Sequence, residues 1–252
     1  METLPVSRTV YARIVFRGPH RQCNGLAAAP EGLWVCDQLD NIVHLVRYED
    51  GAVLTSFRTP ARNASGIAWG AGSVWVASNI RPSAIYRHDP ATGHCLAALI
   101  LPDSDRGGVH GIEWWPYRPG EPVPPPPPPR PQLHPRTPGG EPNAGPGVSG
   151  TLWVTRPGAR IIQHLDAETG DVLGTIPFPA PRSHGLYWDD TDGSIVCVET
   201  NTNVCYRLDP DTGAIRDAWR IEGVEAHGLT RSTDGRVWVC DAATNSIAVL
   251  EL

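Results

Sequence analysis

Short apolar runs, most of them alternating with polar residues, are separated by glycine- and aspartate-rich turns along most of the chain. Typical runs are GLWVCD, SVWVAS, SIVCVE and RVWVCD, and typical turns are APEG, DDTDG and STDG. Alternation with a period of two, interrupted by such turns, favours short β-strands. The chain is therefore predicted to be all-β.

The strand pattern repeats at a spacing that indicates a β-propeller. Five segments share a glycine followed by an apolar residue, and the residue before the glycine varies: CNGL, ASGI, VHGI, SHGL and AHGL. Their spacing is roughly 40–45 residues apart from one longer interval, which is typical of four-stranded propeller blades.

The sequence predicts one domain, 1–252, built of five four-stranded blades. The fifth unit ends after its third strand, and RIVFRGPHRQCNG (13–25) aligns with LTSFRTPARNASG (54–66). An N-terminal strand within 8–19 is therefore expected to complete the last blade, which also removes an exposed sheet edge. The expected blades span about 24–63, 64–108, 109–182, 183–225 and 226–252 plus 8–19.

The longer interval contains a proline-rich insertion at 116–149. Six successive prolines, Pro124 to Pro129, favour polyproline II and do not join a sheet ladder. We expect a surface excursion between the first two strands of the third blade. The alternative is a docking segment for a protein partner that reads proline, because a PxxP pattern is present.

Repeat geometry places the variable residue before each shared glycine at one mouth of the central channel. These residues are Asn24, Ser65, His110, His184 and His227. Three neutral imidazoles around one axis match the ligands of a catalytic zinc with an open fourth position. Iron, copper and manganese accept the same ligands. The pattern predicts a divalent-metal site at His110, His184 and His227; inherited channel packing is the alternative.

A second set of varying residues follows the strand that carries the repeated tryptophan, on the same face. Its members are Asp37, Ser78, Arg156, Glu199 and Asp241. We expect the acids, Glu199 foremost, to act as general bases or to orient metal ligands. Arg156 is expected to bind an anionic group of a substrate. The alternative for the acids is turn capping, and Glu113 and Glu225 are further candidates for a base.

Composition excludes several classes of function. The net charge is −6 and every one of the 21 basic residues is arginine, without a basic stripe, so nucleic acid is not expected as a partner. Without lysine the chain has no side-chain amine for a Schiff base. No apolar run approaches the ~18 residues of a membrane span and the N-terminus lacks a signal-peptide pattern, so we expect a cytoplasmic protein without a membrane partner.

The six cysteines lack a CxxC pair and most lie in strand patterns. Buried free thiols are expected in a cytoplasmic protein. Cys197 and Cys205 flank one expected hairpin, and the sequence leaves open whether they form a disulfide.

The motifs G[LI]xx, DGx[LV]WV and Ixx[LH]DxxTG resemble the propeller superfamily of streptogramin lyases, gluconolactonase-type enzymes and NHL repeats. The resemblance covers nearly all of the chain, but its motifs are structural. It implies enzymes that use a metal at one face of a propeller: lyases that open a macrolactone, or lactonases with an ion held by acidic and amide groups. This chain has fewer expected blades and a histidine-rich axis, so no catalytic residue is transferred. The chain is also similar in size to plant-type glutaminyl cyclases, but it lacks the repeat motifs that are characteristic of them.

These patterns together favour a metal-dependent lyase, hydrolase or isomerase that acts on a small polar metabolite or natural product. The metal would polarise a carbonyl or activate water. The alternative is a non-catalytic propeller scaffold that binds a peptide or protein. A redox protein that uses the same histidines for copper or iron is a third reading.

Overall fold

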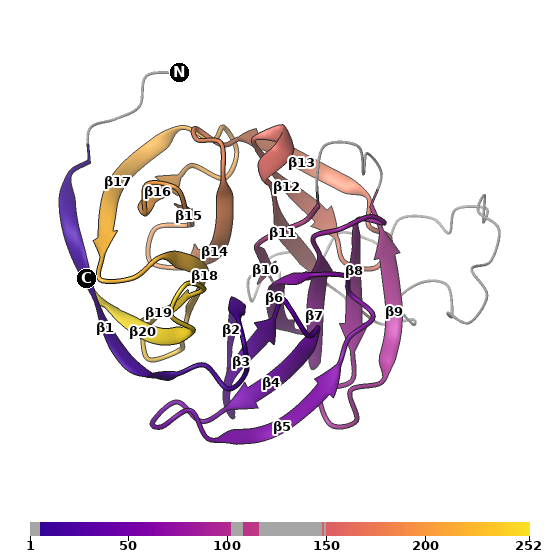
Figure 1. Cartoon of the computed structure of the whole chain (residues 1–252). Coiled ribbons are helices and arrows are strands. Elements are labelled where there is room, and N and C mark those ends of the chain that lie inside the picture. The colour runs from indigo at the N-terminus through magenta and orange to yellow at the C-terminus, as the bar shows by residue number, and fades with distance from the viewer. Residues whose placement is uncertain (1–5, 102–107, 116–147, 149) are drawn as a thin grey trace.

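The computed structural model describes residues 6–101, 108–115, 148 and 150–252. Its strands form sheets arranged radially around one axis, with the innermost strands at the centre and the outermost at the rim (Figure 1). The all-β prediction is confirmed. None of the helical structure in the described ranges is long and apolar enough to cross a membrane.

Three of the sheets are four-stranded and antiparallel, and each follows the chain from the axis outward. The first contains β2 (Cys23–Ala29), β3 (Gly32–Asp37), β4 (Ile42–Val46) and β5 (Val53–Arg58). The second contains β6 (Ala64–Gly70), β7 (Ser73–Ser78), β8 (Ala84–His88) and β9 (Cys95–Ile100). The third contains β10 (Ile112–Trp115), β11 (Thr151–Arg156), β12 (Ile161–Asp166) and β13 (Val172–Pro177), with a short 3-10 turn at Pro157–Ala159.

The remaining strands form one eight-stranded sheet, which the N-terminal strand joins together. Its first half is β14 (Ser183–Asp189), β15 (Ser194–Glu199), β16 (Val204–Leu208) and β17 (Ile215–Glu222). Its second half is β18 (Ala226–Arg231), β19 (Val237–Asp241), β20 (Ser246–Glu251) and β1 (Arg8–Arg17). β1 pairs antiparallel with β20 and parallel with β17. The predicted pairing of the N-terminal strand with the C-terminal strands is therefore confirmed.

The glycines of the innermost strands let the backbones meet around the axis. A Cβ on Gly66 would overlap the carbonyl oxygen of His110, and one on Gly111 would overlap that of His184. Gly185 lies in the same way against Gly228, and Gly228 against Gly25, whose own neighbour is Gly66. The contacts form a closed circle. Only glycine permits this approach, which explains why the shared glycine recurs in the sequence.

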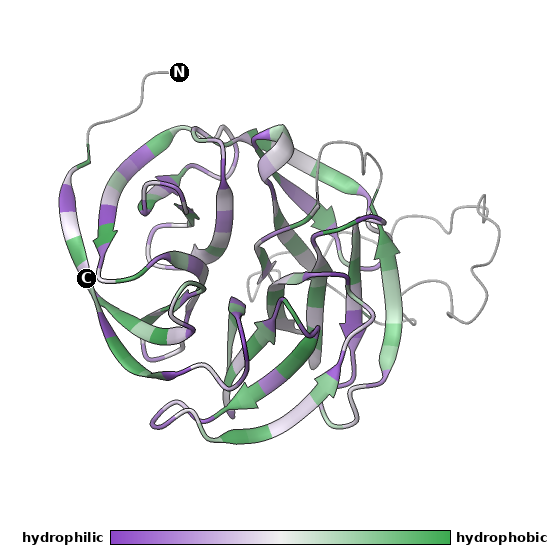
Figure 2. Ribbon diagram, in the orientation of Figure 1, coloured by the Kyte–Doolittle hydropathy of each residue, from purple (hydrophilic) through white to green (hydrophobic). Residues whose placement is uncertain are grey.

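The apolar core lies between neighbouring sheets, where apolar residues are concentrated in the strands (Figure 2). Trp34 of the first sheet packs with Ile67 and Val74 of the second, and Trp238 of the last packs with Leu26 and Val35 of the first. Burial of each such side chain contributes about 2–3 kcal/mol. Two phenylalanines of outer strands also pack against tryptophans of their own sheets: Phe16 against Trp238 and Phe57 against Trp34.

Three asparagines, each after the second strand of a four-strand unit, hold the innermost strand of the next unit. Asn41, Asn203 and Asn245 have positive φ, at 53°, 52° and 54°. Each side-chain Oδ1 accepts a hydrogen bond from a backbone N–H at the start of the next innermost strand, at 2.8–3.0 Å. Asparagine suits these positions because it tolerates the left-handed region and carries an acceptor.

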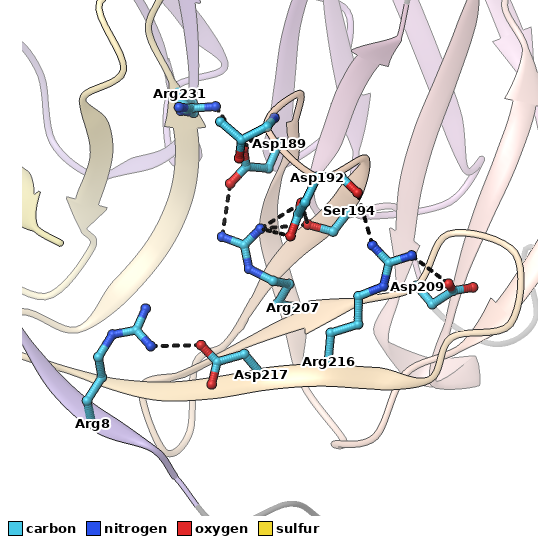
Figure 3. A network of polar contacts seen from close by, with 10 residues as sticks. Arg8, Asp189, Asp192, Ser194, Arg207, Asp209, Arg216, Asp217 and Arg231 are labelled. Atoms are coloured by element: carbon cyan, nitrogen blue, oxygen red, sulfur yellow. Dashed lines mark hydrogen bonds and ion pairs between the residues drawn. The ribbon is translucent and has the colours of Figure 1, made fainter.

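A network of ion pairs joins the two halves of the eight-stranded sheet (Figure 3). Asp189 accepts from Arg207 at 2.9 Å and from Arg231 at 2.8 Å, and Arg207 also binds Asp192. Asp189 is buried and therefore requires both partners. The network lies at the end of β14 that is distant from His184, so it belongs to the framework.

All six cysteines are free thiols, five of them buried, as expected. Cys197 and Cys205, for which a disulfide was left open, are both reduced. The proline-rich insertion at 116–149 lies outside the described residues except for Val148.

Candidate functional site

A β-bulge in each of four innermost strands turns the residue before the shared glycine toward the axis. The register against the second strand shifts between Cys23 and Gly25, Ala64 and Ile67, Ser183 and Leu186, and Ala226 and Leu229. A bulge re-aims a side chain by adding one unpaired residue. The bulges therefore place Asn24, Ser65, His184 and His227 at one mouth of the axis, and His110 directly precedes β10.

The three histidines are in mutual contact at this mouth. His110 Nδ1 and His184 Nε2 lie 2.9 Å apart, so one ring donates a hydrogen bond to the other. The rings of His184 and His227 meet edge to face with centroids 4.4 Å apart. His184 and His227 are buried, and His110 is partly buried. The structure thus brings together the three residues that the sequence placed on one axis.

His227 is held at both ring nitrogens. Asn24 Nδ2 lies 3.3 Å from His227 Nδ1, and His227 Nε2 lies 3.0 Å from Glu225 Oε1. Because the amide NH2 of Asn24 only donates, Nδ1 is the acceptor and the proton sits on Nε2, which donates to Glu225. The result is a directed chain of two hydrogen bonds that ends at a carboxylate.

Ser65 does not take part in this chain. Its Oγ donates to the carbonyl oxygen of Val109 at 2.5 Å. It therefore links β6 to the segment that precedes β10, and its hydroxyl is not directed at the imidazole rings.

Burial keeps the histidines neutral. It lowers the pKa of His110 to about 4 and that of His184 well below the usual range. Burial also lowers the pKa of His227, against an opposing effect of the hydrogen bond to Glu225. The positive charge of Arg182 lowers the pKa of all three. The mouth therefore combines neutral imidazoles with one cation and one anion.

The glycine circle closes the axis behind the histidines. It leaves a cavity of about 10 Å³, lined by the shared glycines and by Leu26, Ile67, Ile112, Leu186 and Leu229. This is room for one water at most. A ligand therefore reaches the histidines from the mouth side.

A metal bound by three histidines needs one nitrogen lone pair from each ring to converge on one point. Here His110 and His184 direct nitrogens at each other, and both nitrogens of His227 have partners. Among the described residues, the three rings do not bring one nitrogen each within 4.8 Å of one another. His184 Nδ1 and Asn24 Oδ1 are buried without a hydrogen-bond partner. The residue types suit a metal, but the ring orientations in this structure do not fit one.

The acids of the predicted second set cap turns. Asp37 accepts four backbone N–H groups, from residues 21, 22, 39 and 40. Glu199 accepts from the backbone of Asn201 and Thr202, and Asp241 from Ala243 and Thr244. This is the alternative that the sequence left open. These three carboxylates therefore serve the turns that follow the second strands.

Arg156 and Glu113 are also separate from the mouth contacts. Arg156 is buried and donates to Gln163 Oε1 at 3.2 Å. Glu113 lies three residues beyond His110 on β10, about 10 Å along the strand. Burial raises the pKa of Glu113 to about 8, so its carboxyl is largely neutral near pH 7.

The charged residues beside the histidines share a position that the sequence analysis did not use. Arg182 and Glu225 each stand two residues before a ring histidine, in RSH and EAH. Residues two apart in an extended chain face the same side. The equivalent positions elsewhere hold Gln22, Asn63 and Gly108. The charge two residues before a ring histidine was the sequence signal that could have identified Arg182. Glu225 was named from the sequence as a further candidate for a base, and it makes the hydrogen bond with His227.

No model of a known protein family matches the chain, and no curated protein matches it in sequence. Among solved structures it is similar to Myxococcus xanthus glutaminyl cyclase, with a TM-score of 0.69 and 11% identity over 96% of this chain and 97% of that one. It is similar to a streptogramin B lyase, with a TM-score of 0.52 and 14% identity over 96% of this chain and 98% of that one. It is also similar to the WD40 β-propeller domain of Doa1, with a TM-score of 0.52 and 12% identity over 94% of this chain and 81% of that one.

Identities this low establish a shared fold. The chain has a β-propeller fold, and the resemblance to streptogramin lyases is confirmed as one of structure. These neighbours include enzymes and a WD40 domain, so the fold by itself does not select a function.

Proposed function

We propose that this chain is a five-bladed β-propeller enzyme that works at its histidine-lined mouth. In this proposal the blades have the boundaries expected from the sequence, and the eight-stranded sheet is counted as two blades joined by β1. Two observations support a count of five blades. The shared glycines form a closed circle of five, and there are five apolar clusters among the described residues, each of which would lie between two neighbouring blades. The site residues are Glu225, His227, Asn24 and Arg182.

The observation that carries the proposal is the chain from Asn24 through His227 to Glu225. The side chain of Glu225 is 49% exposed, so one face of its carboxylate is open to a ligand at the mouth. His227 fixes the other side at 3.0 Å, and Asn24 fixes the tautomer of His227. An oriented carboxylate with an accessible oxygen is suited to accept a proton.

The chemistry follows from the charges around that carboxylate. Arg182 is close enough to lower the pKa of all three histidines. A mouth that carries both a proton acceptor and a cation favours steps in which a substrate loses a proton while negative charge grows on a carbonyl oxygen. Elimination that opens a lactone and cyclisation of an amine onto an amide both contain such a step. We therefore propose a lyase or cyclase reaction on a small polar substrate.

The test is a paired assay on two substrates suggested by the structural neighbours. Opening of streptogramin B and release of ammonia from a peptide with an N-terminal glutamine are measured for the wild type, Glu225→Gln and Glu222→Gln. Glu222 is an exposed glutamate three residues away and serves as the matched control. The proposal predicts turnover of one substrate, about 10²-fold slower in Glu225→Gln and unchanged in Glu222→Gln. Equal rates in both variants, or no turnover together with no substrate-induced shift of the imidazole NMR signals, would overturn it.

The predicted metal at His110, His184 and His227 remains a second proposal for this mouth. It is supported by three neutral imidazoles in contact and by the unpartnered Nδ1 of His184, and it requires the rings to turn. Metal analysis of untagged protein tests this second proposal. About one equivalent of transition metal in the wild type, lost in His184→Ala, supports it. Metal content unchanged by that substitution contradicts it.

A binding role without catalysis is the alternative from another class. The WD40 neighbour has the same fold, and the proline-rich insertion at 116–149 remains the proposed contact for a protein partner. Loss of a captured partner on deletion of 116–149, with no activity in the paired assay, supports this role.

A further inference from the structure

We propose that His20, Asp37 and Asp40 form a divalent-metal site beside the point where the ring closes. His20 lies in the segment between β1 and β2, and the two aspartates lie at and just after the end of β3. This site is separate from the axial mouth and is independent of the proposed catalytic role. A bound ion would tie the ring-closing segment to the first sheet.

The three side chains present their ligand atoms to a common space. His20 Nδ1 lies 2.9 Å from Asp40 Oδ2 and 3.7 Å from Asp37 Oδ2. Within the described ranges, this is the one group of three histidine, cysteine or acidic residues whose ligand atoms lie within 4.8 Å of one another. The set offers one imidazole and two carboxylates, which suit borderline divalent ions.

The short contact between His20 and Asp40 does not have the geometry of a hydrogen bond. Asp40 Oδ2 is buried and has no hydrogen-bond partner among the described groups, although His20 Nδ1 is 2.9 Å away. The ring N–H direction therefore misses the oxygen. Two ligands of one ion at about 2.1 Å stand roughly 3 Å apart with both lone pairs directed at the ion. The observed pair has that separation.

Asp37 and His44 hold the ligands in place. Asp37 is buried, and four backbone N–H groups fix its carboxylate; two of them donate to Oδ2, the oxygen nearer to His20. His44, 6% exposed, stacks under His20 with centroids 5.6 Å apart, and its Nε2 has no hydrogen-bond partner. Nitrogen and oxygen atoms around a metal are commonly oriented by such supporting groups. Because N–H donors occupy Asp37, we expect it to contribute mainly charge, and His20 and Asp40 to contribute the stronger bonds.

The site is open on the His20 side, whose side chain is 35% exposed. Water would complete the coordination there. A site with few protein ligands binds less tightly than a closed structural zinc site. A ligand that binds only the folded state raises the unfolding temperature, because it stabilises that state by RT ln(1 + [L]/Kd).

The test uses untagged, chelator-treated, full-length protein and Zn²⁺ as the probe. Calorimetric titration and thermal unfolding with and without Zn²⁺ are compared for the wild type, His20→Ala, Asp40→Asn, His184→Ala and His94→Ala. His94 is an exposed histidine away from both sites and is the matched control. Circular dichroism confirms that each variant is folded.

We expect Zn²⁺ to bind the wild type and raise its unfolding temperature, with binding weakened at least 10-fold in His20→Ala and Asp40→Asn. His94→Ala and His184→Ala should retain this binding. No zinc binding by the wild type, binding unchanged in His20→Ala and Asp40→Asn, or binding lost in His184→Ala would overturn the proposal. Because Glu225 is untouched throughout, failure here leaves the activity test of the mouth unaffected.

Discussion

His227 Nε2 lies 3.0 Å from Glu225 Oε1. Glu225 stands two residues earlier in the chain, directly before β18. The contact joins a buried neutral imidazole to an exposed carboxylate. It gives the carboxylate a fixed orientation at the mouth of the propeller, while Asn24 holds the far side of the ring.

The first prediction concerns this contact. Glu225 raises the pKa of His227, through the hydrogen bond and its charge, against the larger effect of burial. Glu225→Gln should therefore lower the pKa of His227 further. NMR titration of the imidazole measures it, with Glu222→Gln as the control that leaves the pKa unchanged. A rise of the His227 pKa in Glu225→Gln would contradict the assignment.

The second prediction concerns stability in acid. The pKa of His110 falls from 6.5 to about 4 on folding. The unfolded chain therefore binds more protons between these values, so stability is complete above pH 6.5 and is lost as the pH falls toward 4. At pH 5 the loss from His110 alone is about 2 kcal/mol. Urea unfolding of the wild type and His110→Gln at pH 7 and pH 5 measures it. Equal pH dependence in both proteins would contradict the prediction.

The third prediction concerns Asn203, which joins the two halves of the eight-stranded sheet. Asn203 accepts from the Ala226 N–H and donates to the Val224 carbonyl with a positive φ. Asn203→Ala removes both hydrogen bonds and strains the backbone, for a loss of about 2–3 kcal/mol. Asn203→Gly relieves the strain and should lose less. Denaturant unfolding measures both, and an Asn203→Ala variant as stable as the wild type would refute the role.

The fourth prediction concerns the glycine circle. A Cβ on Gly66 overlaps the His110 carbonyl oxygen, which is backbone and does not move away readily. Gly66→Ala should therefore lose more than about 3 kcal/mol or fail to fold. Gly174→Ala is the control because its Cβ meets nothing closer than 3.9 Å. Unfolding curves compare them; equal stability would show that the innermost strands are not packed this closely.

The fold was predictable because its determinants are local and repeated. Alternation, turn residues and the shared glycine at the start of each innermost strand all recur in the sequence. The N-terminal closure followed from aligning 13–25 with 54–66, and β1 pairs with β20 as expected. Register within each sheet follows from the same alternation. The number of blades stays a proposal because β1 merges two sheets into one.

The site was less predictable because side-chain direction depends on groups that the sequence does not place. The mouth position of His110, His184 and His227 followed from repeat equivalence, whereas their ring orientations depend on contacts between different sheets. The carboxylates of Asp37, Glu199 and Asp241 are engaged by turn N–H groups, a local effect that competes with any catalytic role. Glu225 and Arg182 each lie on the same side of the chain as the ring histidine two residues later. This relationship becomes visible only when the starts of β14 and β18 are known.

The most direct test of the mouth is the tautomer of His227 near pH 7, read from its imidazole ¹⁵N shifts. The account predicts a proton on Nε2 and a bare Nδ1, since Asn24 donates to Nδ1 and Glu225 accepts from Nε2. A proton on Nδ1, or a signal unchanged by Glu225→Gln, would contradict the oriented Asn24–His227–Glu225 chain on which the proposed chemistry depends.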